Sequence, residues 1–368
     1  MTKARVEVDT SILDGRVKEL LQDRSLLDKY NDNQKREKKL LARIKELERE
    51  NQKLKSLPQK EQKQRREIIK NQFKIATQGL TASELNRKTN ALWKEGKYTN
   101  PDRAIAYLSE AIRLDSRYAE AYNNRGIAWS DKGNYDRAIS DYDKAIELDP
   151  RDAEVYYNRG ITWKVKGNYD QAIWDYDKAI ELNPRHVDAY YNRGIAWSDK
   201  GNYDRAISDY NKAIKLNPRY AFVYNNRGNT WHRKGNYDQA ISDYDKAIEL
   251  NPRHVDAYYN RGVAWSDKGN YDRAISDYDK AIELNPRHAF VYNTRGIAWY
   301  RKGYYDQAIS DYDKVIELNP KYADAYNNRG IAWFFKGSYD RSCHDFQKAC
   351  ELGKCKGLNW AMKKGYCK

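Results

Sequence analysis

A sequence period of 34 residues is the feature that most constrains the fold of this chain. Two glycines recur with this period, and the second follows the first by seven residues. The first series consists of Gly126, Gly160, Gly194, Gly228, Gly262, Gly296 and Gly330. A fixed period of roughly 20 to 50 residues is typical of a solenoid, a propeller or another repeat array.

Each repeat encodes two helices, as residues 119–152 illustrate. Tyr122, Gly126 and Trp129 have the spacing of one face of a first helix. Gly133 then provides a helix stop and a turn. Apolar residues at three- to four-residue spacing follow as a second helix, which a proline ends. The pattern predicts an all-α array of helix hairpins.

The repeat resembles the tetratricopeptide repeat (TPR) family, over residues 119–356 in seven copies. Positions 1 to 34 of each repeat are counted here from residues 119, 153, 187, 221, 255, 289 and 323. The family pattern of aromatic, Gly, Ala, aromatic, Ala and Pro is matched in the first copy by Tyr122, Gly126, Ala138, Tyr142, Ala145 and Pro150. The resemblance implies a right-handed superhelical solenoid of TPR hairpins.

The ends of the array diverge, as expected for repeats that lack one neighbour. Residues 82–118 are interpreted as a divergent first repeat, and Thr81 with Glu84 has the spacing of a capping box at its start. Residues 357–368 are predicted to form a C-terminal capping helix. Residues 1–81 are of another kind and are predicted to form long helices, here called the stem.

The aromatic content, with 32 Tyr and 10 Trp, is interpreted mainly as packing. Seven Trp residues fall at repeat position 11, and a periodic Trp favours helix packing over a ligand site. The sequence contains no nucleophile elbow, P-loop or HExxH motif. We therefore expect no enzymatic activity, no cofactor and no metal.

One departure from the family pattern is systematic, because position 7 is Arg rather than Leu and position 23 is Asp in all seven repeats. A half-buried guanidinium requires a carboxylate partner, so we predict an Arg–Asp ladder inside the stack. The predicted pairs are Arg125–Asp141, Arg159–Asp175, Arg193–Asp209, Arg227–Asp243, Arg261–Asp277, Arg295–Asp311 and Arg329–Asp345. The alternative is a stripe of arginines that binds phosphate or nucleic acid.

The resemblance also implies that the first helices line a groove that binds protein segments. Position 6 is Asn124, Asn158, Asn192, Asn226, Asn260 and Asn328, with Thr294 as the exception. This series resembles the asparagine ladder of the repeat domain of O-linked N-acetylglucosamine transferase, and an amide both donates and accepts hydrogen bonds. The aromatic candidates for partner contact are Tyr157, Tyr191, Tyr259, Phe222, Phe290, Phe334 and Phe335. The alternative role for the asparagines is helix packing.

The stem combines a hydrophobic seam with basic charge. The seam consists of Leu40, Ile44, Leu47, Asn51 and Leu54, and Asn at an a position of a coiled coil fixes its register. Residues 1–81 contain 21 basic and 13 acidic residues, a net charge of +8. We expect the seam to mediate self-association, either as a coiled coil or by docking on a neighbouring chain. The charge favours an acidic partner, nucleic acid or an anionic membrane, or else belongs to a solvated surface.

All four cysteines, Cys343, Cys350, Cys355 and Cys367, lie in the last 26 residues. Their spacing matches no standard zinc pattern, so we predict structural thiols or disulfides, with Cys355–Cys367 as the preferred pair. The N-terminus shows no secretory signal, which makes the cytoplasm the default expectation. Disulfides would instead indicate an extracellular or periplasmic location.

The leading function hypothesis is a non-enzymatic scaffold that binds extended or helical protein segments in its groove. The alternative is a structural protein that self-assembles into a helical filament through contacts between the stem of one copy and the solenoid of another. A third hypothesis is binding of nucleic acid or another acidic partner by the stem. Protein segments and further copies of the chain are the expected partners, nucleic acid is not, and no membrane span is expected.

Overall fold

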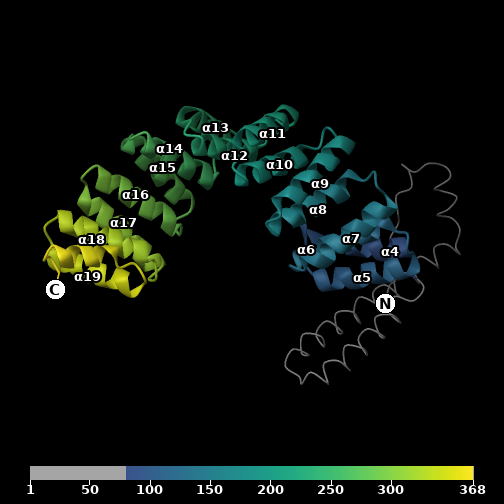
Figure 1. Cartoon of the computed structure of the whole chain (residues 1–368), viewed down its shortest axis with the longest axis horizontal. Coiled ribbons are helices and arrows are strands. Elements are labelled where there is room, and N and C mark those ends of the chain that lie inside the picture. Colours follow the sequence, from purple (N-terminus) through teal and green to yellow (C-terminus); the bar gives the residue numbers. More distant parts are fainter. Residues whose placement is uncertain (1–79, 368) are drawn as a thin grey trace, which may run out of the picture. The chain divides into compact units, whose positions relative to one another are not determined.

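The computed structural model describes residues 80–367, most of which lie in helices (Figure 1). The prediction of an all-α fold built from helix hairpins is confirmed. The chain divides into two compact units, the first of which ends at Asp149 and the second of which begins at Pro150. Within residues 80–367, no helix is both long enough and apolar enough to cross a membrane.

The first unit contains four described helices and one short strand pair. Its elements are α4 (Ala82–Asn90), β1 (Trp93–Lys94), β2 (Lys97–Tyr98), α5 (Pro101–Leu114), α6 (Ala119–Asp131) and α7 (Tyr135–Leu148). The capping box predicted at Thr81 is confirmed, because Glu84 N–H donates to Thr81 Oγ1 and Thr81 N–H donates to the Glu84 carboxylate. Leu85, Tyr107 and Leu108 form the centre of this unit's core.

The divergent first repeat contains an antiparallel strand pair that the sequence did not predict. Glu95 and Gly96 both have positive φ, of 51° and 80°, so they form the left-handed two-residue turn that joins tight hairpins. Tyr98 N–H donates to Asp131 Oδ2 over 2.7 Å, which ties β2 to the end of α6. The first helix of this repeat is therefore short, and the strand pair occupies the space of its last turn.

The second unit consists of six complete hairpins and a terminal helix. The first helices are α8 (Ala153–Val165), α10 (Val187–Asp199), α12 (Ala221–Arg233), α14 (Val255–Asp267), α16 (Ala289–Arg301) and α18 (Ala323–Phe335). The second helices are α9 (Tyr169–Leu182), α11 (Tyr203–Leu216), α13 (Tyr237–Leu250), α15 (Tyr271–Leu284), α17 (Tyr305–Leu318) and α19 (Tyr339–Glu351). The terminal helix α20 (Lys356–Lys363) ends before the C-terminal limit of the predicted capping segment.

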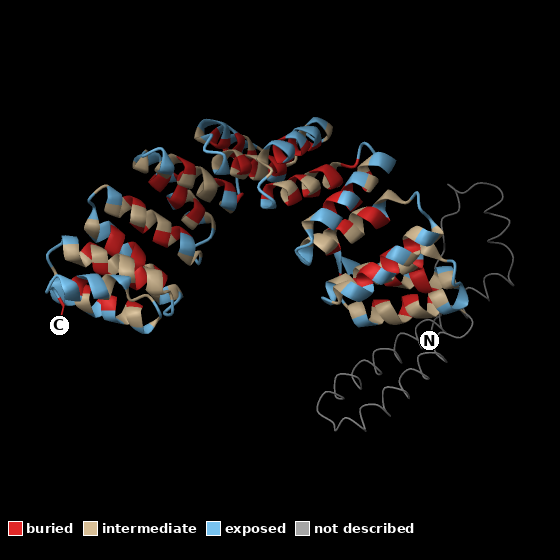
Figure 2. Ribbon diagram, viewed as in Figure 1, coloured by how far each residue is buried: buried red, intermediate tan, exposed pale blue. Residues whose placement is uncertain are grey.

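Glycine fixes both the turn and the packing of each hairpin, as α12 and α13 show. Gly235 ends α12 with a φ of 80°, and the next residue, Asn236, donates its N–H to the carbonyl of Trp231 over 2.9 Å. A Cβ placed on Gly228 would lie 2.6 Å from Cε1 of Tyr244, whose ring is almost fully buried. Glycine at position 8 therefore lets the buried Tyr ring of the second helix contact the backbone of the first. Figure 2 shows the buried residues along the helices of the array.

Paired charges connect the helices within and between repeats, as the Arg261 guanidinium illustrates. Its Nε and Nη2 donate to Asp277 over 2.9 and 2.6 Å, within the same repeat. Its Nη1 donates to Asp245 on the preceding second helix. Burial raises the pKa of Asp277, against the opposing effect of Arg261. The desolvation is therefore a real cost, which the two-point pairing offsets.

The same bidentate pairing occurs in all seven repeats. The further pairs are Arg125–Asp141, Arg159–Asp175, Arg193–Asp209, Arg227–Asp243, Arg295–Asp311 and Arg329–Asp345. Because each guanidinium is engaged by carboxylates and at most about one fifth exposed, these arginines are interpreted as structural rather than as a phosphate-binding stripe.

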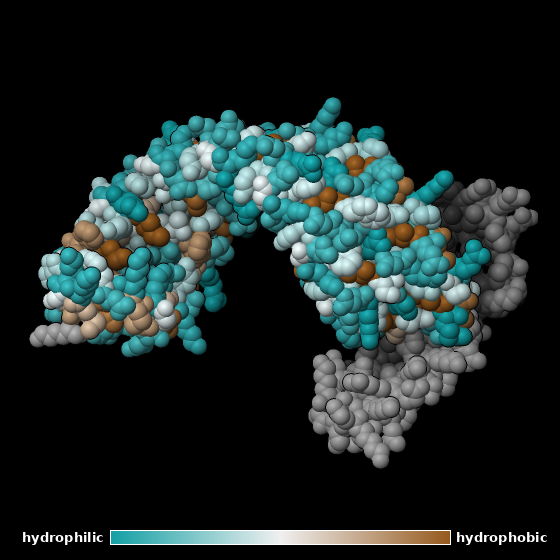
Figure 3. All heavy atoms as spheres, viewed as in Figure 1, coloured by the Kyte–Doolittle hydropathy of each residue, from teal (hydrophilic) through white to brown (hydrophobic). Residues whose placement is uncertain are grey.

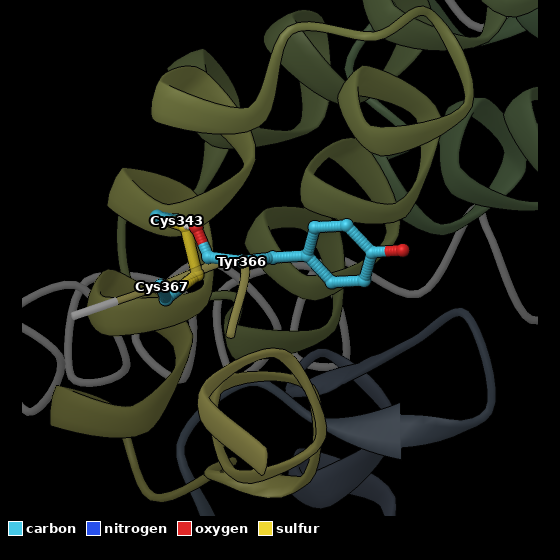
Figure 4. The surroundings of a disulfide bond; sticks show 3 residues. All are labelled: Cys343, Tyr366 and Cys367. Carbon is cyan, nitrogen blue, oxygen red and sulfur yellow. Dashed lines mark hydrogen bonds between the residues drawn. A yellow bond between two sulfur atoms is a disulfide. The ribbon is translucent and has the colours of Figure 1, made fainter. Parts of the chain in front are cut away.

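The pairing of the cysteines corrects one prediction. Disulfides join Cys343 to Cys367 and Cys350 to Cys355, so the preferred pair Cys355–Cys367 was wrong. Cys355 precedes α20 and Cys367 follows it, and a helix of this length spans about 12 Å, beyond the reach of a disulfide. After α20, Gly365 with a φ of 76° reverses the chain and brings Cys367 back to α19 (Figure 4).

The two carboxylates that contact Arg261 provide a matched test of the ladder. We expect Asp277→Asn to lower the free energy of unfolding by about 2 kcal/mol, because it leaves a largely buried guanidinium without its charged partner. Asp245→Asn removes a carboxylate that is 55% exposed and is expected to cost less than about 1 kcal/mol. Urea unfolding of both variants measures the difference, and equal costs would contradict the structural role of the ladder.

Candidate functional site

The first helices of the second unit present a continuous row of polar and aromatic side chains. We call it the first-helix face and define it by positions 2, 5 and 6 of each repeat together with position 34, the last residue of the repeat. Positions 2, 5 and 6 lie in the first two turns of each first helix, and position 34 lies directly before the next one. This is the face on which the sequence analysis placed its groove residues.

The asparagines at position 6 are hydrogen-bonded across the repeats. Asn226 donates to the Tyr191 hydroxyl over 2.6 Å, and Asn260 donates to Asn225 Oδ1 over 3.1 Å. The equivalent bonds join Asn192 to Tyr157, Asn328 to Asn293 and, in the first unit, Asn124 to Asn86. Asn158 occupies the same position in α8, and Thr294 instead donates to the carbonyl of Phe290.

These bonds give the asparagines the packing role that the sequence analysis held as its alternative. Each bond runs from position 6 of one repeat to position 5 of the repeat before it. Position 5 supplies an acceptor in each case, whether it is Tyr or Asn. The amides therefore fix the register between successive first helices, and their contact with a peptide backbone stays a prediction.

Aromatic and imidazole rings run along the same face, and we call this set the ring stripe. Its members are Tyr157, His186, Tyr191, Tyr220, Phe222, His254, Tyr259, His288 and Phe290. Tyr191 contacts Tyr220 with ring centroids 5.4 Å apart, and Tyr220 continues the contact to Phe222. Tyr220, at position 34, thus connects position 5 of its own repeat with position 2 of the next. The position 34 histidines instead contact a ring at position 5 or 2 of their own repeats.

Phe222 and Phe290 are the two members of the ring stripe that are most open to solvent. Phe222 is 51% exposed and Phe290 is 48% exposed. Each is held from one side by another ring, with His254 at 4.8 Å from Phe222 and Tyr259 at 5.7 Å from Phe290. The surface in Figure 3 is mostly hydrophilic with small hydrophobic areas. Phe222 and Phe290 are therefore candidate contact residues and not parts of a large apolar patch.

Phe334 and Phe335, the other two phenylalanines predicted to touch a partner, belong to a separate cluster beside α20. The Phe334 ring lies 5.1 Å from Trp360 and 4.9 Å from Tyr366. Phe335 is 54% exposed and stacks on Tyr305. Phe334 therefore packs the C-terminal cap, whereas Phe335 stays open to solvent.

The charges on the first-helix face are mainly negative. Glu154 Oε1 lies 3.3 Å from Nε2 of His186, a contact that lowers the pKa of Glu154. Asp188 accepts a hydrogen bond from the Tyr220 hydroxyl over 3.2 Å. Burial lowers the pKa of His254, whose ring is only 5% exposed. Within residues 80–367, no group of three or more His, Cys, Asp or Glu side chains is arranged to hold a metal ion.

Position 34 is the part of the face that sequence reasoning missed. Its His and Tyr residues recur with the period of the repeat. One sequence feature could have identified it: in the seven repeats, a ring at position 34 always follows a first helix that has an aromatic residue at position 2 or 5. The self-association residues Leu40, Ile44, Leu47, Asn51 and Leu54 lie outside the residues that the structure describes.

The buried His254 ring gives the array a predictable response to acid. Because burial lowers its folded pKa below the unfolded value of about 6.5, the unfolded chain binds more protons as the pH falls. The neutral His254 ring therefore contributes fully to the free energy of unfolding above about pH 6.5, and this contribution is lost as the pH falls further. Urea unfolding between pH 7.5 and 5.5 measures this loss, and His254→Gln is expected to reduce the dependence; an unchanged dependence would contradict the assignment.

Comparison with known families identifies the repeat along most of the array. Models described as tetratricopeptide repeat match residues 119–152, 153–186 and 187–220 one repeat at a time. Further models of the same description match residues 209–242 and 232–289. A model described as TPR repeat matches residues 299–337. None of the curated proteins compared with the chain matches it.

Solved structures share the fold. A tetratricopeptide repeat protein from Parabacteroides merdae ATCC 43184 is 24% identical, with a TM-score of 0.52 over 65% of this chain and 95% of that one. The pilF protein of Pseudomonas aeruginosa is 20% identical, with a TM-score of 0.51 over 58% of this chain and 99% of its own. YrrB, a TPR protein with an unusual peptide-binding site, is 29% identical, with a TM-score of 0.44 over 51% and 97%.

Proposed function

Because the chain belongs to the tetratricopeptide repeat family, we propose that it is a non-enzymatic scaffold that binds extended protein segments on its first-helix face. The observation that carries the proposal is the ring stripe. Its two Phe side chains are half exposed, and each contacts a ring of the preceding repeat, with His254 of the same repeat as a further contact of Phe222. Aromatic side chains, Phe among them, are enriched at the cores of protein–protein interfaces.

The hydrogen bonds between neighbouring side chains of the first-helix face support this function. The position 6 amides and position 5 acceptors pair with each other, so the surface is ordered before any partner arrives. A surface that is ordered in advance loses less conformational entropy on binding. The described first-helix face offers aromatic rings, amides and carboxylates to a partner.

Selection of binding peptides followed by hydrogen exchange tests the proposal. Peptides are selected from a random display library against the full chain, and amide exchange is then compared with and without the selected peptides. We expect protection in α10, α12, α14 and α16 and unchanged exchange in the second helices α11, α13 and α15. Failure to select any peptide, or protection confined to the second helices, would contradict the proposal.

Self-assembly through the stem is a second candidate function, which the charge distribution favours. Residues 1–81 carry a net charge of +8, while position 2 of the described repeats supplies five carboxylates. A basic segment of one copy and an acidic face of the next form a heterologous contact, which generates open assemblies when it does not close into a ring.

Sedimentation velocity of the full chain tests this second candidate. We expect the mean sedimentation coefficient to rise with protein concentration at low salt. Added salt is expected to reverse the rise, because it screens the attraction between stem and face. A single species of monomer mass at every concentration and salt level would rule out self-assembly.

A further inference from the structure

The side chains at position 2 form a pattern along the first-helix face of the second unit. In chain order they are Glu154, Asp188, Phe222, Asp256, Phe290 and Asp324. The two Phe residues replace carboxylates in alternate repeats, so one acidic residue lies between them and others lie outside them. This order of apolar and acidic contacts is a property of this chain's sequence rather than of the repeat fold.

In the described part of the chain, the two carboxylates nearest to the Phe rings have no Lys or Arg partner, and Asp256 interacts electrostatically with the buried His254. Within residues 80–367, neither Asp188 nor Asp256 lies within ion-pair distance of a Lys or Arg side chain. The outer two differ, because Glu154 contacts His186 and Asp324 pairs with Lys354. The negative charge that is free to attract a partner is therefore concentrated around Phe222 and between the two Phe rings.

The Phe rings themselves are positioned to receive apolar side chains. Phe222 is bordered by Tyr220 and His254, and Phe290 by Tyr259. His254 is 5% exposed and burial lowers its pKa, so it places an uncharged ring beside Phe222 at neutral pH. Each Phe is therefore packed against another ring while about half of its side chain stays exposed.

The distance between the two Phe rings sets the spacing that a ligand must match. Phe222 lies on α12 and Phe290 on α16, with the first helix α14 between them in the array. Taking about 8–10 Å, the usual distance between packed helices, for each of the two steps gives an upper spacing of about 16–20 Å between the rings. An extended chain rises about 3.3 Å per residue, so it covers this distance in about five or six residues.

We propose that the face binds an extended peptide segment with two apolar side chains about five or six residues apart and Lys or Arg between and beside them. The proposal rests on the proposed function and adds the chemistry of the partner. The apolar side chains contact Phe222 and Phe290. The basic side chains lie opposite Asp188 and Asp256, which have no Lys or Arg partner among residues 80–367.

Fluorescence anisotropy with synthetic peptides tests the proposal on the full chain. The probe is a labelled Ser/Gly peptide of about 12 residues, with two Leu about five positions apart and Lys between and beside them. One control peptide carries Ser in place of both Leu, and another carries Glu in place of every Lys. These controls need no change to the protein, so their outcome does not depend on whether a variant folds.

The protein variants separate the two kinds of contact. Combined Phe222→Ala and Phe290→Ala is expected to weaken binding of the probe at least about tenfold. Asp256→Asn is expected to weaken it a few-fold and to reduce its dependence on salt. The matched control is Trp174→Ala, because Trp174 is 49% exposed but lies on the second helix α9. It is expected to leave binding unchanged.

Two results would overturn the inference while leaving the proposed function intact. One is selection of peptides that protect the first helices although the Glu peptide binds as tightly as the Lys probe. The other is binding of the probe that the double Phe variant does not weaken. If no peptide of any composition protects the first helices, the proposed function fails, and the inference fails with it.

Discussion

The contact between glycine at position 8 and the buried Tyr or Phe ring at position 24 is the constraint on which the rest of the array depends. At Gly228, any side chain would collide with Tyr244, and the same holds for the equivalent glycine in each of the seven 34-residue repeats. The contact sets how closely the two helices of a hairpin approach. With that separation fixed, the Arg at position 7 reaches the Asp at position 23 for a bidentate bond.

The Arg–Asp ladder connects adjacent repeats, whereas the Gly–ring contact sets the helix separation within one repeat. Arg193, Arg261, Arg295 and Arg329 each bind one carboxylate in their own repeat and another in the repeat before. A second set of ion pairs, such as Lys268 with Asp238, also spans neighbouring repeats. Successive first helices thereby take the same relative position, which is what aligns the rings and carboxylates at position 2 into one face.

The sequence predicted the parts of this structure that follow from a period. Helix hairpins, the capping box at Thr81 and the partners of the position 7 arginines all follow from spacing and from the need to pair a half-buried charge. The strand pair after α4 was missed because Glu95 adopts a positive φ, which its residue type does not favour. Disulfide pairing was missed because it depends on how the chain turns after α20, outside the period.

The Cys343–Cys367 bond lies at one end of an array in which stability passes from each repeat to its neighbour. Such arrays lose structure by fraying, and a repeat at an end frays first because it has contacts on one side only. The disulfide between α19 and the segment after α20 prevents fraying from starting at this end. Fraying of the second unit then proceeds toward its C-terminal end, and the repeats next to the disulfide are the last to lose their register.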